Sequence, residues 1–350
     1  MKKNIFGMFS NEIAALIAPY GLPKYSALQI AKWMYQSGMA DFEGMTNLSK
    51  KHRALLTEHF AIHSLTTQAA EHSADGKTSK YLLKFNDGLA VETVLMRQAY
   101  GNCVCVSTQV GCAMGCLFCA STLNGVERNL TSGEMLAQVL YSSQLLAQEN
   151  TAVNTIVIMG SGEPLANYEN VLRFIRLCHA EYGLHLSYRN ITLSTSGLVP
   201  EMKKLAAEEL PITLSISLHA PTNELRSYLM PVNNRYPLAE VMAAGDIYAE
   251  RTGRRVTYEY ILIDGLNDKA EHACQLAMLM KGRLANVNLI PVNPVVERGL
   301  LRPSVKAIQQ FEKILLEKRV TVTVRREMGT DIRAACGQLR HKVLYTKFPG

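Results

Sequence analysis

From residue 103 onward, short runs rich in β-branched residues alternate with stretches whose apolar residues recur at helical spacing. The predicted strands are Val104–Ser107, Ile156–Met159, Ile191–Ser194, Ile212–Leu218, Val256–Ile263 and Val287–Pro291. The predicted helices are Ser132–Gln148, Asn170–Tyr182, Ala239–Thr252, Lys269–Met280 and Val305–Lys318. Strands that alternate with helices form a parallel sheet. Because these units are too few for a closed eight-stranded barrel, the pattern predicts an α/β fold with a partial, open (β/α)6 barrel.

The chain around this barrel divides into further segments. We expect an N-terminal helical accessory domain, a linking β-hairpin, the barrel, and a C-terminal loop and tail, at residues 1–75, 76–102, 103–325 and 326–350. The hairpin is indicated by strand-like runs at Tyr81–Phe85 and Val91–Met96, on either side of the turn Asn86-Asp87-Gly88. A last strand, Val320–Arg325, leads into the C-terminal loop.

Three cysteines follow the first strand of the barrel. Cys112, Cys116 and Cys119 stand at a C-x3-C-x2-C spacing. A [4Fe–4S] cluster usually takes four cysteines, so three would leave one iron with an open position for a small molecule. A zinc knuckle is the alternative, but zinc sites usually show two paired clusters of Cys or His, and the sequence has no second C-x2-C. The spacing therefore favours an iron–sulfur cluster.

Small polar residues follow several predicted strands, at the end of the barrel where α/β barrels bind ligands. After the second strand, Gly160 and Gly162 let the backbone approach a ligand closely, and Glu163 offers a carboxylate for an ammonium group. Other candidates at strand ends are Ser194, Ser217, Leu218, His219 and Asn293. Each alone is more often a turn or a helix cap. Together at one face of a barrel, they predict a ligand with ribose hydroxyls and an adenine edge.

Composition and charge narrow the class of protein. Hydrophobic residues make up 48% and charged residues 19% of the chain, and no apolar run approaches the roughly 18 residues that span a bilayer. The N-terminus lacks the apolar segment of a signal peptide, so we expect a cytoplasmic protein without a membrane partner. Eight cysteines in 350 residues are too sparse for a disulfide scaffold. The net charge of +7 mildly favours nucleic acid as a partner.

Two cysteines outside the triplet stand in informative places. Cys105 lies on the first predicted strand of the barrel, and Cys336 lies in an arginine-rich loop with small and polar neighbours. A lone cysteine is usually a small buried hydrophobe, which is how we interpret Cys178 and Cys274 because both fall in predicted helices. The sequence does not decide the role of Cys103.

These motifs resemble a known family. The cysteine spacing resembles the signature of the radical S-adenosylmethionine (radical SAM) superfamily. Longer stretches resemble the RlmN family, the adenine-C2 methyltransferases of 23S rRNA and tRNA. The matching stretches, from about Tyr25 to Arg340, include Val91–Val94, Cys105–Cys112, Arg128–Leu130, Ser217–Pro221, Asn288–Asn293 and Ala334–Leu339. One departure is Ser161, where the family usually has methionine.

The resemblance implies a radical SAM barrel with a mechanism based on two cysteines. A [4Fe–4S] cluster on the cysteine triplet and two SAM molecules per turnover would be needed. The first SAM methylates Cys336; the second, cleaved at the cluster, supplies a radical that abstracts hydrogen from the S-methyl group. The resulting carbon radical adds to adenine C2, which is covalent catalysis. Cys105 then takes the C2 proton and forms a disulfide with Cys336, and Glu92 matches a proton acceptor of the family.

The resemblance also implies ligand contacts and partners. It assigns the amino group of SAM to the loop that carries Gly162 and Glu163. The substrates would be 23S rRNA at the peptidyl-transferase centre and tRNA at the adenosine 3′ of the anticodon, with the N-terminal domain binding RNA. An external flavodoxin-type electron donor is implied, and we expect a monomer.

Two alternative functions remain open. A Cfr-type enzyme, which methylates C8 of the same rRNA adenosine, shares the cysteines. Glu163-Pro164 and Cys119–Leu123 resemble the C2 enzymes more closely. A metal-stabilised RNA-binding protein without catalysis would explain the charge and the metal loop, but it would not explain Cys336 or the polar strand ends.

Overall fold

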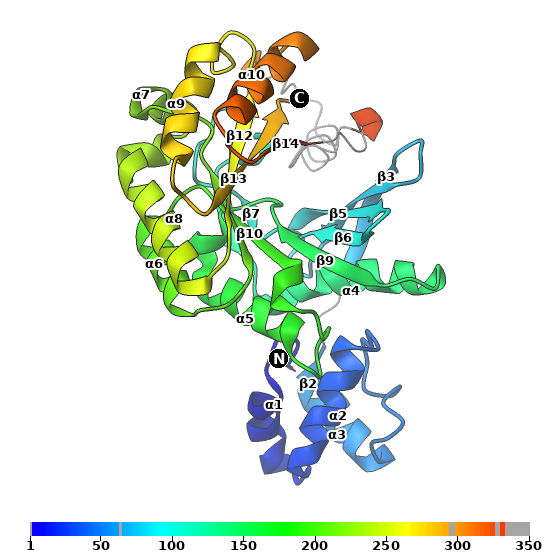
Figure 1. The fold of residues 1–350 in the computed structure, drawn as a ribbon. Coiled ribbons are helices and arrows are strands. Elements are labelled where there is room, and N and C mark those ends of the chain that lie inside the picture. Colours follow the sequence, from blue (N-terminus) through cyan, green and yellow to red (C-terminus); the bar gives the residue numbers. More distant parts are fainter. Residues whose placement is uncertain (1, 63–64, 294–297, 326–329, 333–350) are drawn as a thin grey trace.

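The computed structural model describes residues 2–62, 65–293, 298–325 and 330–332. The N-terminal residues form a small helical unit, drawn in blue in Figure 1. Its elements are β1 (Lys3–Asn4), α1 (Ser10–Ile17), α2 (Lys24–Tyr35), α3 (Lys50–His59) and β2 (Phe60–Ala61). Arg173 ties the unit to the rest of the chain, because its guanidinium donates to the Gly7 carbonyl at 2.7 Å and forms an ion pair with Glu12.

One ten-stranded sheet organises the rest of the chain, in the order β14-β13-β12-β11-β10-β9-β6-β5-β4-β3. The strands are β3 (Thr66–His72), β4 (Thr78–Lys84), β5 (Ala90–Gln98), β6 (Gly101–Cys105), β9 (Val153–Ile158), β10 (Ile191–Thr195), β11 (Thr213–Ser217), β12 (Val256–Leu262), β13 (Ala285–Pro291) and β14 (Val322–Val324). Strands from β6 to β14 run parallel, whereas β3 to β6 pair antiparallel. The predicted partial barrel and its hairpin are confirmed, and β3 is an additional strand that the sequence analysis did not predict.

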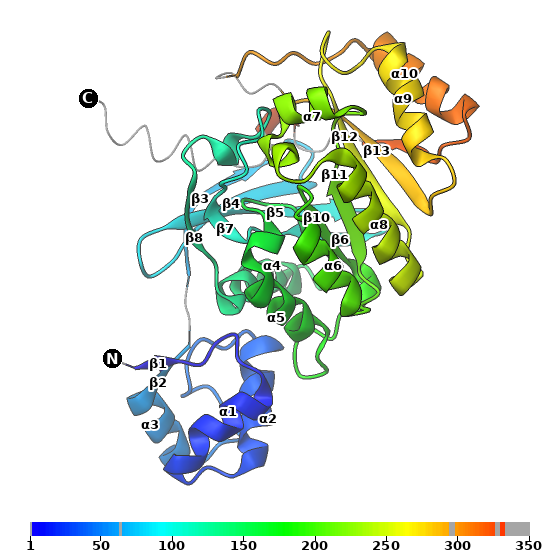
Figure 2. The same ribbon diagram turned by 90° about the vertical axis from the view of Figure 1, so that its left-hand side faces the viewer.

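Helices cover the outer face of this curved sheet (Figures 1 and 2). They are α4 (Ser132–Gln148), α5 (Tyr168–His179), α6 (Val199–Ala207), α7 (Asn223–Leu229), α8 (Leu238–Thr252), α9 (Ala270–Met280) and α10 (Val305–Glu317). Helix α4 begins at a capping box, in which the Thr131 hydroxyl accepts from the Glu134 amide and the Glu134 carboxylate accepts from the Thr131 amide. Helices α6 and α7 were not predicted, because their nine and seven residues are too few to show a clear helical period.

The two faces of the sheet have different roles. The Thr93 hydroxyl on β5 donates to Gln138 of α4 at 2.9 Å, so Thr93 faces the outer helices. Because side chains alternate along a strand, Glu92 and Val94 point to the inner face, which we call the lumen. Cys105 lies opposite Val94 in the β5–β6 register, so it also points into the lumen. In the described ranges of the chain, no helix is long and apolar enough to cross a membrane.

Candidate functional site

The cysteine triplet lies in a pinched loop beyond the end of β6. The loop leaves the short strand β7 (Gln109–Gly111) and returns through β8 (Val126–Asn129), which pairs with it. The Cys112 amide donates to the Gly125 carbonyl at 2.8 Å. Gly111 has φ +78°, and a Cβ there would fall 2.0 Å from that same oxygen. Only glycine allows so close an approach, so the base of the loop is narrow.

The three thiols are suited to a cationic cluster. Cys112 and Cys116 are buried, and burial raises the pKa of Cys112 to about 12 and that of Cys116 further. Burial also raises the pKa of Cys119. A charged Cys119 would further raise the pKa of Cys112 and Cys116, and a charged Cys112 would raise that of Cys116, so these thiols need nearby positive charge to ionise. Among the described residues, no three side chains converge on one metal ion; a cubane takes each thiolate on a separate iron.

Apolar residues bury Cys116 within the cysteine loop. Cys116 packs in a buried cluster with Ala220, Leu229, Met230, Ile261, Ile263 and Val292. The Leu117 amide donates to the Leu229 carbonyl at 2.9 Å, which fixes the loop to the end of α7. The Phe118 ring meets the His219 ring edge to face, with 4.6 Å between the centroids. The loop is therefore held against the C-terminal ends of β11 and β12.

The loop after β9 packs on the chain that links β6 to β7. A Cβ on Gly160 would lie 2.5 Å from the Ser107 hydroxyl, and one on Gly162 would lie 2.6 Å from the Gln109 Cβ. The Thr108 amide donates to the Ser161 carbonyl at 2.8 Å. The Ser161 hydroxyl is buried and donates to the Gly111 carbonyl at 3.4 Å, so serine at this position contacts the start of the cysteine loop.

Glu163 joins two strand ends through its carboxylate. Its Oε1 accepts from the Thr195 hydroxyl at 2.8 Å and its Oε2 accepts from the Ser196 amide at 2.7 Å. The Leu165 amide donates to Oε1 at 3.0 Å. Burial raises the pKa of this carboxyl, and the three hydrogen bonds counter that effect. Because a carboxylate has about four acceptor positions, these bonds leave room for a ligand ammonium group.

His219 lies just beyond the end of β11 and offers one hydrogen-bond donor. It is buried in a left-handed conformation with φ +61°, and its Nδ1 accepts from the Ile261 amide at 3.0 Å. Burial first, and then the charge of Arg226, lower the pKa of His219 to about 3. The imidazole is therefore neutral, and with Nδ1 as an acceptor its proton lies on Nε2.

The other predicted ligand contacts lie at neighbouring strand ends. Ser194 lies near the end of β10 in register with Ser215, and Ser217 is the last residue of β11. Leu218 follows Ser217 and is fully buried. Asn293 is exposed two residues beyond β13. The structure thus brings the candidates from β9, β10, β11 and β13 to one end of the barrel.

Cys105 and Glu92 lie on the lumen face next to this end. Cys105 is the last residue of β6, and Glu92 precedes Val94 by two residues on β5, so both share a face. The Glu92 carbonyl accepts from the Ser107 hydroxyl at 2.7 Å. The charge of Glu92 also contributes to the raised pKa of Cys119, after the larger effect of burial, so the carboxylate lies near the cysteine loop. Cys336 lies outside the described residues, and no disulfide joins two of the described cysteines.

Cys103, which the sequence left undecided, also faces the lumen. It lies opposite Met96, two residues before Cys105 on the same strand. Burial raises the pKa of its thiol to about 11. Cys103 is therefore a matched reference for Cys105 in mutational tests.

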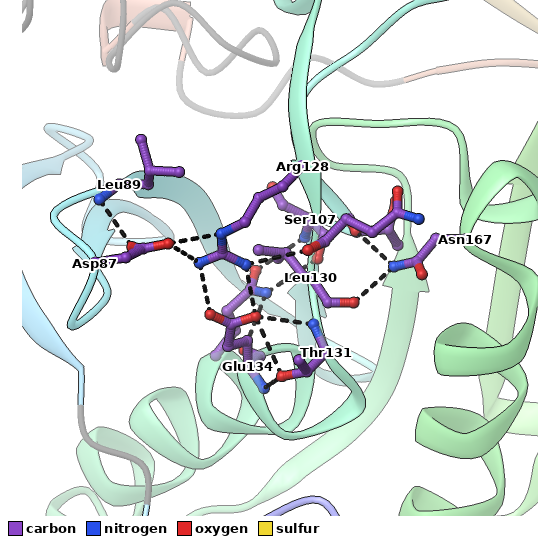
Figure 3. A network of polar contacts seen from close by, with 11 residues as sticks. Asp87, Leu89, Ser107, Arg128, Leu130, Thr131, Glu134 and Asn167 are labelled. Carbon is purple, nitrogen blue, oxygen red and sulfur yellow. Dashed lines mark hydrogen bonds and ion pairs between the residues drawn. The ribbon is translucent and has the colours of Figure 1, made fainter. Parts of the chain in front are cut away.

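A network around Arg128 holds the return strand of the cysteine loop (Figure 3). The Arg128 guanidinium donates to Asp87 in the hairpin turn at 2.7 Å and to both oxygens of Glu134 at 2.7 and 2.8 Å. Asn167 donates to the carbonyls of Thr108 at 2.9 Å and Leu130 at 2.7 Å. These contacts join the β4–β5 hairpin, α4 and the loop after β9.

The sequence analysis did not identify Arg226, which holds the ends of β10 and β11 together through hydrogen bonds to their carbonyl groups. This side chain on α7 is fully buried and donates to the carbonyls of Ser196, Ser217 and Leu218 at 2.7, 3.1 and 3.2 Å. Burial lowers its pKa to about 10, so it keeps its charge at neutral pH. No local motif marks this arginine, because its partners are backbone groups of other elements.

Comparisons with known proteins identify the family of the chain. Residues 106–277 match the Radical SAM superfamily, and residues 3–62 match the ribosomal RNA large subunit methyltransferase N-terminal domain. A protein of Symbiobacterium thermophilum named "Probable dual-specificity RNA methyltransferase RlmN" is 53% identical over 337 residues, which cover 96% of this chain and 91% of the relative. The chain belongs to the RlmN family.

One further relative and one crystal structure are also similar to the chain over nearly its full length. A protein of the same name from Bacillus licheniformis is 48% identical, with 97% of this chain and 94% of the relative covered. The crystal structure of a radical SAM methyltransferase from Sphaerobacter thermophilus is 45% identical and superposes with a TM-score of 0.92, over 96% of this chain and 98% of that one. As a member of the RlmN family, the chain is a radical SAM enzyme that uses a [4Fe–4S] cluster and SAM.

Proposed function

We propose that the chain methylates C2 of adenosine in 23S rRNA and tRNA, with Cys336 as the carrier of the methyl group. RNA as the substrate is supported by the names of the relatives and by the match to an rRNA methyltransferase N-terminal domain. The observation that carries the proposal is the placement of Cys105 and Glu92 on the lumen face beside the cysteine loop. A cysteine thiolate and a carboxylate there can both accept a proton from an adenine that enters the barrel.

The cofactor would be held by the residues at the strand ends. Cys112, Cys116 and Cys119 would hold the cluster, and the carboxylate of Glu163 would accept from the amino group of SAM beside Gly162. Ser194, Ser217, Leu218, His219 and Asn293 would contact its nucleoside and carboxylate groups. When bound, the cluster and SAM supply a radical strong enough to abstract hydrogen from a methyl group.

Cys105 would resolve the covalent RNA adduct. The proposed adduct joins the Cys336 sulfur through a methylene group to adenine C2. The radical adduct would pass one electron to the oxidised cluster and its C2 proton to the Cys105 thiolate. Cys105 then gives that proton to Glu92 and, as a thiolate again, attacks the Cys336 sulfur. The bond between that sulfur and the methylene carbon breaks, the carbon takes up a proton to become a methyl group, and a Cys105–Cys336 disulfide remains. Glu92 would accept a proton in the same sequence.

The adduct provides the test. Cys105→Ala should still attack RNA and then stop, so denaturing gels should show a covalent protein–RNA species. Cys103→Ala is the matched control, because it removes a buried thiol from the same face two residues away. That variant should release product. The double variant Cys105→Ala with Cys336→Ala should form no adduct; adduct in the double variant, or none in Cys105→Ala, would contradict the proposal.

Product analysis decides the position of the methyl group. Mass spectrometry of nucleosides from treated rRNA and tRNA should give 2-methyladenosine, whereas 8-methyladenosine would indicate the Cfr-type reaction. The proposal includes a flavodoxin-type electron donor, a monomer and a cytoplasmic location. Turnover supported by reduced flavodoxin, and a monomeric mass in solution, would test the first two of these.

A further inference from the structure

The short helix η7 (Thr330–Ile332) lies against the β3–β4 hairpin, far from it in sequence (Figure 1, red). The Ala74 amide in the hairpin turn donates to the Asp331 carboxylate at 2.7 Å. The Lys80 ammonium on β4 donates to the Ile332 carbonyl at 3.2 Å. Two separate contacts thus attach the chain just before Cys336 to this hairpin.

Lys80 is an unusual residue at this position. Its side chain is only 1% exposed, although lysine is almost never fully buried unless it is paired. Glu71 on the neighbouring strand lies opposite Lys80, with 3.8 Å between the ammonium and a carboxylate oxygen. At that separation Glu71 balances the charge of the ammonium group, and the Ile332 carbonyl accepts a hydrogen bond from it. The Ile332 carbonyl is therefore part of what makes a buried ammonium acceptable here.

The same lysine lies in one row with the proposed catalytic residues. Lys80 is opposite Val94 on β5, and Val94 is opposite Cys105 on β6. Opposite residues in antiparallel strands share a face, so all three point into the lumen. Two strand spacings separate Lys80 from Cys105, which is about 10 Å. Glu92, two residues before Val94, faces the same way.

We propose that Lys80 and Asp331 are positioning residues, which fix the start of the C-terminal segment on the lumen face so that Cys336 reaches Cys105. This inference rests on the proposed function for the role of Cys336. Cys336 follows Ile332 by four residues (336 − 332 = 4). Four extended residues span at most about 14 Å, which is enough to cross two strands. Without the contacts of Lys80 and Asp331, the start of this four-residue span would not be held near Cys105.

The contact itself can be measured without catalysis. In the full chain, hydrogen exchange of the Ala74 amide should be about tenfold faster or more in Asp331→Ala and in Lys80→Met, because either change releases the segment. Lys80→Arg keeps a cationic donor and should keep slow exchange. Lys84→Met is the matched control, since Lys84 is an exposed lysine on the same strand. Unchanged exchange in both anchor variants would overturn the inference.

The consequence for Cys336 can be measured by disulfide formation. In the full chain, Cys112→Ser, Cys116→Ser and Cys119→Ser remove the thiols of the cysteine loop, and Cys103→Ser removes the thiol beside Cys105. A mild oxidant should then join Cys105 to Cys336, mapped by mass spectrometry. Adding Asp331→Ala or Lys80→Met should slow this reaction about tenfold or more, whereas Lys84→Met should not. Equal rates in folded anchor variants, or no Cys105–Cys336 disulfide in the parent, would overturn the inference.

These measurements separate the inference from the proposed function. Neither uses SAM, RNA or the cluster, so each gives a result even in a protein without activity. If the anchor variants slow disulfide formation but the intact enzyme makes no methylated adenosine, the proposed function fails and the positioning of Cys336 stands. If the enzyme is active and the anchor variants match the parent in both measurements, only the inference fails.

Discussion

The guanidinium of Arg226 donates a hydrogen bond to the carbonyl oxygen of Ser196 at 2.7 Å, although the two residues belong to different strand–helix units. The same side chain donates to the carbonyls of Ser217 and Leu218, and its Nη1 donates to Asn233 at 3.0 Å. The carbonyls of Ser196, Ser217 and Leu218 lie at or just beyond the ends of β10 and β11, where the proposed SAM contacts lie. A single buried cation therefore fixes the relative position of two loops that carry proposed SAM contacts.

Removing this cation should destabilise the protein and weaken ligand binding. Arg226→Met fills similar space but leaves buried carbonyls without donors, so we expect a loss of about 3 kcal/mol in the free energy of unfolding. Urea denaturation of the cluster-free protein measures this loss. Arg235→Met is the control, because Arg235 is exposed nearby; its change should stay within about 0.5 kcal/mol. Equal stability of the two variants would show that the buried hydrogen bonds contribute little.

Local signals explain which parts of the fold could be predicted from the sequence. Helix α4 has the predicted bounds because a capping box marks its start and its apolar residues recur at helical spacing from there to its end. The parallel strands could be predicted because they are short runs rich in β-branched residues that alternate with helical patterns. The seven residues of α7 are too few to show a period, and β3 alternates weakly because it is an edge strand with little buried surface.

The parts of the site that escaped prediction depend on contacts distant in sequence. The cysteine loop and the Gly162-Glu163 turn are each encoded within one short stretch. Lys80 bonds a carbonyl 252 residues away, and Arg226 bonds one 30 residues away. Nothing near either residue distinguishes it from a solvent-exposed cation. Only the sheet register reveals that Lys80 and Cys105 share a face.

The cysteine triplet should be required for iron. Cys112→Ala, Cys116→Ala and Cys119→Ala should each abolish cluster binding, because two thiolates cannot hold the cubane. Iron analysis and visible absorbance after anaerobic reconstitution measure this. Cys178→Ala is the control, since that thiol is buried in α5, and it should keep its iron. Near-full iron in any variant of the triplet would contradict the assignment.

His219 should make stability depend on pH in the acid range. Its folded-state pKa of about 3 lies below the ordinary value of 6.5, so the unfolded chain binds the proton more readily. The stabilisation from neutral His219 is therefore complete above pH 6.5 and is lost as the pH falls toward 3. Relative to His219→Gln, the wild-type chain should lose about 1.4 kcal/mol by pH 5.5. Urea denaturation of both proteins from pH 7.5 to 5.5 tests this; parallel curves would mean that His219 titrates normally.

Gly162 should tolerate no side chain, because two separate constraints meet there. Its φ of +107° is disfavoured for other residues, and a Cβ would lie 2.6 Å from the Gln109 Cβ and 2.8 Å from the Gln109 nitrogen. Gly162→Ala should cost about 3 kcal/mol of stability. Since Glu163 is the next residue, displacement of this turn should also move the carboxylate and weaken SAM binding in the reconstituted enzyme. Gly253→Ala separates the two constraints: Gly253 has φ +63°, but a Cβ there would meet no atom within 4 Å, so this variant should lose only about 1 kcal/mol and keep full SAM affinity. Two results together would contradict this prediction: equal losses of stability in the two variants, and unchanged SAM affinity in both. They would show that the packing of the Gly162 turn on Gln109 does not position Glu163.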